Sequence, residues 1–239
     1  MRTKFAARAG LTLLELVMVV SILAVLTAMV VPGMSSQQEE TRKTVARSSL
    51  NDLRNAITNR YLQDMTDLPR ARADDTTRAS ETVGAVARPL PQLHFLFVNP
   101  NSYVSTATPP YTALNDYDHQ TRLGWNGPYV MTSPGKYPTP TAQRSVKNPN
   151  DARTWADYGF TTSYGNAGDQ TLLDPWGSPY VLVTYDYTHG AAALRSEYLV
   201  SAGPNLKLDH ATWAINTDGS LNSGDDLVLL VRTDADPNP

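Results

Sequence analysis

Residues Leu11 to Val31 read LTLLELVMVVSILAVLTAMVV, an apolar run of twenty-one residues with a single charge at Glu15. A helix of about 20 apolar residues spans the roughly 30 Å hydrocarbon core of a bilayer. A secretory h-region is shorter, about 7 to 15 residues, and a small-residue cleavage site follows it. Residues 29–33, which read MVVPG, do not provide such a site. The run therefore predicts a transmembrane helix over residues 11–31.

Basic residues precede the apolar run, at Arg2, Lys4 and Arg8. Lys and Arg are enriched on the cytoplasmic side of membrane helices. The charge pattern therefore predicts that residues 1–10 stay in the cytoplasm and that the bulk of the chain lies on the far side of the membrane.

A small residue that a peptidase could recognise stands before the apolar run instead of after it. Residues 9–15 read AGLTLLE, which resembles the type IV prepilin leader, G-[FLM]-T-L-[LIV]-E. The resemblance implies that a prepilin peptidase cuts between Gly10 and Leu11 and methylates the new N-terminus at Leu11. It also places Glu15 fifth in the mature chain.

Glu15 has a physical interpretation of its own. A carboxylate among lipid tails costs about 2.5 to 3.5 kcal/mol on insertion scales and is normally kept for a partner. The free α-amine of a neighbouring subunit would serve, so we expect Glu15 to act in filament assembly. The alternative is that Glu15, close to the start of the helix, reaches out to the headgroups.

The pattern beyond the apolar run predicts a second helical half and a globular head. Apolar residues recur every three or four positions from Ala46 to Tyr61, which is typical of an amphipathic helix. Strand patterns follow at residues 180–187, 194–200 and 226–232. The predicted fold class is α+β, with a long N-terminal helix, half membrane-spanning and half amphipathic, packed on a small antiparallel sheet.

The expected organisation has four parts. They are a cytoplasmic leader (1–10), a transmembrane and assembly helix (11–31), an amphipathic stalk helix (32–63) and a globular head (64–239). Turn-rich stretches over residues 70–120 and 131–172 predict loop-rich insertions in the head, with a short helix near residues 79–86 and a buried segment at residues 93–98.

Motifs in the head carry a second resemblance. Residues 124–129 read GWNGPY, residues 174–180 read DPWGSPY, residues 201–205 read SAGPN and residues 224–227 read GDDL. In this order they are similar to G-W-x-G-P-Y, D-P-W-G-x-P-Y, S-A-G-P-D-G and D-D-I of the major pseudopilin of type II secretion. We expect Trp176 and Tyr180 of the second motif to fill the core rather than to form an aromatic sugar-binding surface.

The chain departs from that family in two places. Forty-four residues separate Tyr129 from Asp174, where the family has a much shorter connection. Asn205 stands where the family usually has aspartate.

The resemblance implies a calcium-binding loop between residues 201 and 226. Its implied ligands are Asp225, Asp226, Asn205 and, through its backbone carbonyl, Ser201. Calcium takes about six to eight oxygen ligands from a flexible loop, and Asp209 and Asp218 lie in the same stretch as further donors. The alternative is that these Asp and Asn residues make ordinary turns.

Composition excludes several classes of function. The absence of cysteine removes thiol nucleophiles and disulfides, and a net charge of −3 gives no basic surface for nucleic acid. The sequence lacks the common catalytic fingerprints, and its four histidines stand singly, which is typical of surface or turn residues. We therefore expect a protein that is not an enzyme and has no nucleic-acid partner.

Together the two resemblances predict a structural subunit of a pilus-like filament, the pseudopilus of a type II secretion system. The implied partners are copies of itself, a prepilin peptidase, an inner-membrane assembly platform and minor pseudopilins. The implied location is the bacterial inner membrane, single-pass, with the head in the periplasm, followed by incorporation into a periplasmic or surface filament. A type IV pilus subunit, a minor pilin and a membrane-anchored binding domain that never polymerises stay open as alternatives.

Overall fold

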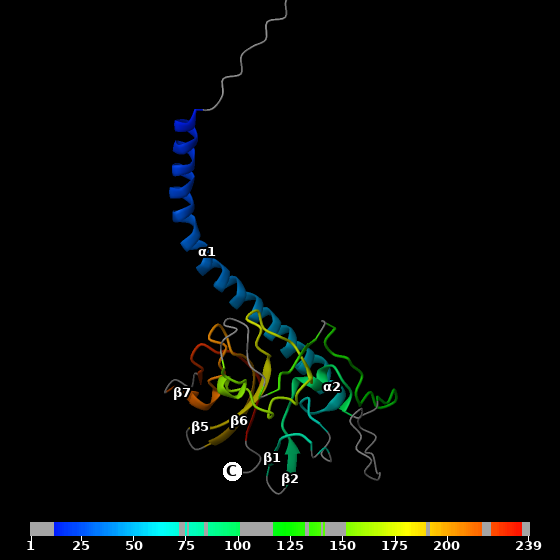
Figure 1. Ribbon diagram of the computed structural model, residues 1–239. Helices are drawn as coiled ribbons and strands as arrows, with labels where there is room; N and C mark the ends of the chain where they lie inside the picture. Colours follow the sequence, from blue (N-terminus) through cyan, green and yellow to red (C-terminus); the bar gives the residue numbers. More distant parts are fainter. Residues whose placement is uncertain are drawn as a thin grey trace, which may run out of the picture. The chain divides into compact units, whose positions relative to one another are not determined.

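The computed structural model describes residues 12–71, 75, 77–83, 86–100, 117–131, 134–139, 141, 152–189, 192–216 and 221–235 (Figure 1). The chain divides into two compact units, Met1–Arg42 and Lys43–Pro239. The second unit is called the head below.

The described elements are mostly short. The helices are α1 (Leu13–Ala56), the π-helix η1 (Ile57–Tyr61), α2 (Leu62–Met65) and the 3-10 turns η2 (Leu93–Leu96), η5 (Ala156–Tyr158) and η6 (His210–Thr212). The strands are β1 (Ser80–Val83), β2 (Val86–Pro89), β3 (Gly135–Lys136), β4 (Gln170–Thr171), β5 (Val181–His189), β6 (Ala192–Ser201), β7 (Ala214–Ile215), β8 (Leu221–Asn222) and β9 (Leu227–Ala235).

A threonine caps the start of α1 in the first unit. The Thr12 side chain accepts a hydrogen bond from the backbone N–H of Glu15, with 3.3 Å between Oγ1 and N. The sequence from Thr12 to Glu15 therefore has the T-x-x-E pattern of a capping box, in which a carboxylate in the first turn also suits the positive end of the helix dipole. The same residues that resemble the prepilin leader thus fix where the helix begins.

The main sheet of the head has three antiparallel strands in the order β5-β6-β9. Val181 pairs with Val200 and Leu182 with Leu199, while Ser201 pairs with Leu227 on the other side of β6. Because successive strand residues point to opposite faces, this register separates the valines from the leucines. Each set builds a core on its own face of the sheet.

The leucine face packs against the last turns of α1 and the start of η1. Leu182 and Leu199 share a buried cluster with Leu50, Leu53 and Ile57, all at most 2% exposed. These helix residues recur every three or four positions, which is the spacing that puts them on one face.

The valine face is covered by the segment between the two sequence motifs and by the C-terminal loops. Its buried aromatic partners are Trp155, Tyr158, Phe160, Trp176 and Trp213. Trp176 and Tyr180 are 3% and 2% exposed, so the prediction that they fill the core is confirmed.

The predicted fold class is wrong. The strands of the described chain fall into four separate antiparallel sheets, three of them two-stranded, and not into one small sheet. Only the part of α1 from Lys43 onward belongs to the compact unit that contains the sheets. The physical reason is that the turn-rich insertions form strand pairs of their own, β1 with β2 and β3 with β4. The head is therefore more than a helix laid on one sheet.

The predicted transmembrane helix over residues 11–31 is also contradicted. In the part of the chain that the structure describes, no helix is both long enough and apolar enough to cross a membrane. The predicted location, a single-pass protein of the bacterial inner membrane with a periplasmic head, is corrected by the same finding.

Local predictions in the head had mixed outcomes. The three long strands occur where the strand patterns placed them, and residues 93–98 are mostly buried, as expected. The short helix expected near residues 79–86 is wrong, because β1 and β2 form an antiparallel pair there, with Val83 opposite Val86.

Candidate functional site

The expected cleavage site, Gly10 and Leu11, lies outside the described residues. Glu15 is exposed in the first turn of α1. The cleavage, methylation and pairing expected of these residues therefore stay predictions.

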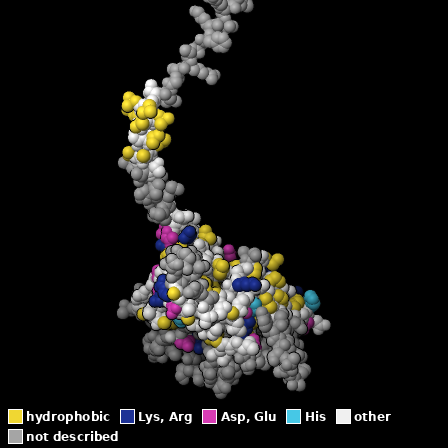
Figure 2. Space-filling view, in the orientation of Figure 1, with side chains coloured by type: hydrophobic (Ala, Val, Ile, Leu, Met, Phe, Trp, Pro, Cys, Tyr) yellow, Lys and Arg dark blue, Asp and Glu magenta, His cyan; other side chains and the backbone are white. Residues whose placement is uncertain are grey.

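A continuous apolar surface surrounds the first turns of α1, seen as the yellow segment of Figure 2. At least half of the surface of every large apolar side chain in this part is exposed. The residues are Leu13, Leu14, Leu16, Val17, Met18, Val19, Val20, Ile22, Leu23, Val25 and Leu26. Because they occupy nearly every position, no side of the helix is polar, and a helix that is apolar all round is normally buried. This segment is called the apolar helix surface below.

Two acidic loops meet next to the main sheet. One follows β6 and contains Asn205 and Asp209, and the other precedes β9 and contains Asp225 and Asp226. The Asn205 amide nitrogen donates hydrogen bonds to Asp225 Oδ1 at 2.5 Å and to Asp209 Oδ2 at 3.3 Å. The loops approach closely because residue 203 is glycine: a Cβ there would lie 2.6 Å from the Asp225 carbonyl oxygen.

Asp226 is the buried member of this group. Its Oδ2 accepts hydrogen bonds from the Asp209 backbone N–H and from Trp213 Nε1, both at 3.0 Å. Its Oδ1 is buried and has no hydrogen-bond partner among the described residues. Burial, with the nearby carboxylates of Asp209 and Asp225, raises the pKa of Asp226 to about 7, although its two hydrogen bonds act in the opposite direction.

Asp226 should make the stability of the head depend on pH. A folded-state pKa above the value of about 3.9 in unfolded chains means that the folded protein holds the proton more tightly. This contribution to stability is present in full below about pH 4 and is lost as pH rises through about 7. As the pH is lowered from 8 to 5, the melting temperature of the wild type should therefore rise relative to that of Asp226→Asn.

The difference in melting temperature between the wild type and Asp226→Asn isolates the effect of Asp226, because other groups, such as His94, titrate in both proteins. Thermal melts at several pH values would measure it. A difference that stays constant across this range would contradict the raised pKa of Asp226.

The predicted calcium ligands do not form a coordination sphere. Asn205 turns its nitrogen, not its oxygen, toward the carboxylates. The Ser201 hydroxyl donates to Asp174 Oδ2 at 2.7 Å, so the carbonyl oxygen is the atom that Ser201 could offer to a metal. Among the described residues, no three acidic or histidine side chains are grouped so that they could hold a metal ion. Asp226 Oδ1 is the one buried oxygen here without a donor, far short of the about six to eight that calcium takes. Calcium binding stays a prediction that this donor set does not fit.

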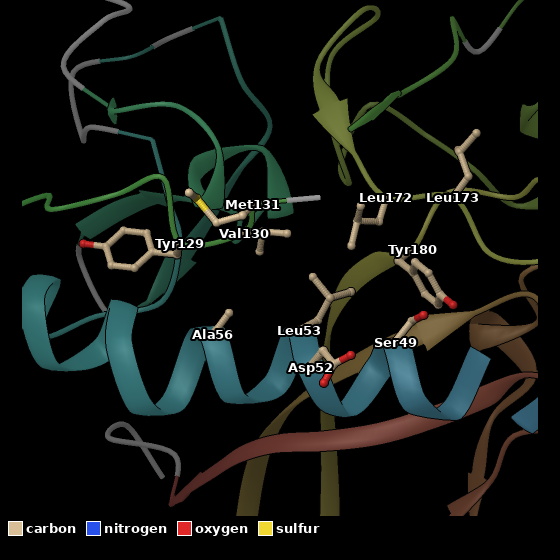
Figure 3. Close-up of a pocket in the computed structure, with 10 residues that line it drawn as sticks. All are labelled: Ser49, Asp52, Leu53, Ala56, Tyr129, Val130, Met131, Leu172, Leu173 and Tyr180. Carbon is tan, nitrogen blue, oxygen red and sulfur yellow. The ribbon is translucent and has the colours of Figure 1, made fainter. Parts of the chain in front are cut away.

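An apolar groove runs beside α1 in the head, with a volume of about 350 Å³. Figure 3 shows Leu53 rising from α1 while Leu172 and Tyr180 approach from the opposite side. At the rim Met131 is 85% exposed and Leu173 is 47% exposed. An exposed methionine beside leucines is typical of adaptable surfaces for protein contact.

A buried ion pair joins two insertions of the head. Arg78 donates to both carboxylate oxygens of Asp169, at 2.5 and 3.1 Å, and also to Gln92 Oε1 at 2.5 Å. The side chains of Arg78 and Asp169 are only 2% and 8% exposed. This pair leaves no local signal in the sequence, since 91 positions separate its members.

His94 completes the same cluster; it lies in the 3-10 turn η2 and is buried rather than at the surface. It is 4% exposed, and its Nδ1 accepts a hydrogen bond from the Gln170 backbone N–H at 2.9 Å. That bond places the proton of the neutral ring on Nε2, which lies 3.8 Å from Asp169 Oδ1. Burial lowers the pKa of His94, with the Asp169 carboxylate acting in the opposite direction.

Comparison with known proteins finds no relative. No protein-family model, no curated protein and no solved structure matches this chain.

Proposed function

We propose that the chain is the structural subunit of a pilus-like filament of the pseudopilus type, assembled through the first turns of α1. The observation that carries the proposal is the apolar helix surface, in which every large apolar side chain from Leu13 to Leu26 is at least half exposed. Contiguous exposed apolar surface of this extent marks a site of association.

The distribution of that surface favours many neighbours over one. A helix that pairs with a single partner needs an apolar stripe on one face and polar residues on the other. Here Val17 and Val19 lie about 200° apart around a helix with 3.6 residues per turn, and each is at least 50% exposed. A bundle in which several copies surround each helix covers both sides, and this is the arrangement of a filament core.

The leader resemblance supports the same function. The resemblance assigns cleavage after Gly10 by a prepilin peptidase, which would leave the apolar helix surface next to the new N-terminus. Glu15 is the only charged side chain within the surface, and we assign it to the α-amine of a neighbouring copy. The rival function, a binding domain that never polymerises, needs no partner for Glu15.

Single cysteines test whether both sides of the helix become covered. The chain has no cysteine of its own, so Val17→Cys and Val19→Cys each introduce one reporter thiol. In cells that carry a prepilin peptidase and a filament-assembly system, a water-soluble maleimide should label both positions at least tenfold more slowly than it labels Ser48→Cys, at an exposed position of the head part of α1.

Glu15→Val, combined with each cysteine, shows whether the slow labelling is caused by filament assembly or by some other apolar environment. Protection that comes from neighbouring copies should disappear in this background. Protection that persists, or rapid labelling of one side in the wild-type background, would overturn the proposed filament core.

A further inference from the structure

The two acidic loops of the head meet without a metal ligand set, and one amide group lies between their carboxylates. Asn205 Nδ2 is within hydrogen-bond distance of Asp225 Oδ1 and of Asp209 Oδ2. An amide nitrogen carries two hydrogens, so it can donate to both carboxylates at once. It occupies the place that a cation bridging the two loops would take.

The orientation of the Asn205 amide is fixed by its other end. Asn205 Oδ1 accepts a hydrogen bond from the Lys207 backbone N–H at 2.6 Å, closing a local turn. Rotating the amide by 180° would point its hydrogens at that N–H and its oxygen at two carboxylates, so all three hydrogen bonds would be lost. Asn205 is therefore a donor toward Asp209 and Asp225, and not an oxygen ligand.

Lys207 adds a positive charge to the same group. Its Nζ lies 3.1 Å from Asp209 Oδ1, while the Asn205 amide takes Oδ2. Each oxygen of Asp209 thus faces a donor from the loop that follows β6. The repulsion between Asp209 and Asp225 is relieved by groups of this chain itself.

We propose that Asn205 and Lys207 replace a bridging divalent cation, so that the head folds and keeps its stability without calcium. Asn205→Asp would keep an oxygen for the Lys207 N–H, since either side chain can close that turn. It would also turn the bridging donor into a third carboxylate between Asp209 and Asp225. The substitution should convert a loop that is indifferent to calcium into one that depends on it.

Thermal unfolding of the purified full chain, with 1 mM calcium chloride or with the chelator EGTA, tests the proposal. Tryptophan fluorescence is a suitable signal because Trp213 contacts Asp226 in this cluster. The wild type should melt at the same temperature, within about 1 °C, in both solutions. Asn205→Asp should melt about 5 °C or more below the wild type in EGTA, and calcium should restore at least half of the loss.

Asn205→Ala is the matched control, since it removes the donor and adds no charge. It should melt below the wild type, and to the same extent in calcium and in EGTA. A calcium-induced rise in the melting temperature of the wild type would overturn the proposal and restore a resident cation. An Asn205→Asp chain that is as stable as the wild type in EGTA, or that calcium fails to rescue, would overturn it too.

Discussion

Arg78→Ala is expected to destabilise the head by about 3 to 5 kcal/mol, because it leaves the Asp169 carboxylate buried without its charge partner. Asp169 is 7% exposed, and both of its oxygens accept hydrogen bonds from Arg78. A domain is stable by only about 5 to 15 kcal/mol, so the loss would be a large share of the total. Urea unfolding at pH 8, where His94 is neutral, measures it.

Two further variants show whether the buried charge is the cause. Arg78 also lies 3.5 Å from the buried carboxylate of Asp75. Arg78→Met with Asp169→Leu and Asp75→Asn removes all three charges, and it should recover most of the stability that Arg78→Ala loses. Arg195→Ala breaks another two-contact pair, with Asp186, whose side chain is 63% exposed. It should cost less than about 1 kcal/mol. Equal losses for Arg78→Ala and Arg195→Ala would refute the role of burial.

Glu15→Val is expected to abolish filaments while leaving cleavage after Gly10 intact. In the proposed filament core, the neighbour's α-amine would be buried and uncompensated once the carboxylate is gone. A loss of about 3 kcal/mol at each subunit contact raises the concentration needed for assembly by about a hundredfold. Electron microscopy of the filaments and mass spectrometry of the N-terminus measure the two effects separately.

The capping geometry at Thr12 calls for a separate control. Glutamine replaces glutamate in capping boxes, so Glu15→Gln keeps the helix start and removes only the charge. It should also fail to assemble if charge pairing is what matters. Glu40→Val, at an exposed position of the same helix, should assemble normally. Filaments formed by Glu15→Gln would mean that capping, and not pairing with an α-amine, explains the need for Glu15.

The parts of the fold that the sequence predicted are those with a local pattern. Apolar and aromatic runs identified the three long strands, and the three-to-four spacing of Leu50, Leu53 and Ile57 identified the buried face of the helix formed by α1 and η1. The error near residues 79–86 has a local cause as well, because so short a segment has no period that separates a helical turn from a tight strand pair. The separation into four sheets depends on long-range pairing, such as Gly135 with Thr171, which no local pattern contains.

The candidate sites also differ in how far the sequence could predict them. The apolar helix surface and Glu15 are readable directly, because they lie within one run of sequence. The meeting of Asn205 with Asp209 and Asp225 was partly anticipated from the motif resemblance, but the direction of the amide depends on the Lys207 N–H and could not be read from residue types. The ion pair of Arg78 with Asp169 gave no signal, since each residue sits alone among turn-forming neighbours.

The aromatic cover over the valine face of the main sheet comes largely from residues that lengthen the connection between the two pseudopilin-like motifs. Trp155, Tyr158 and Phe160 all belong to that stretch, and Val181 and Val183 lie beneath the cluster they form. A chain that kept these valines and lost the long connection would expose an apolar sheet face and aggregate. Shortening the connection in this chain should therefore be tolerated only together with polar substitutions at Val181 and Val183.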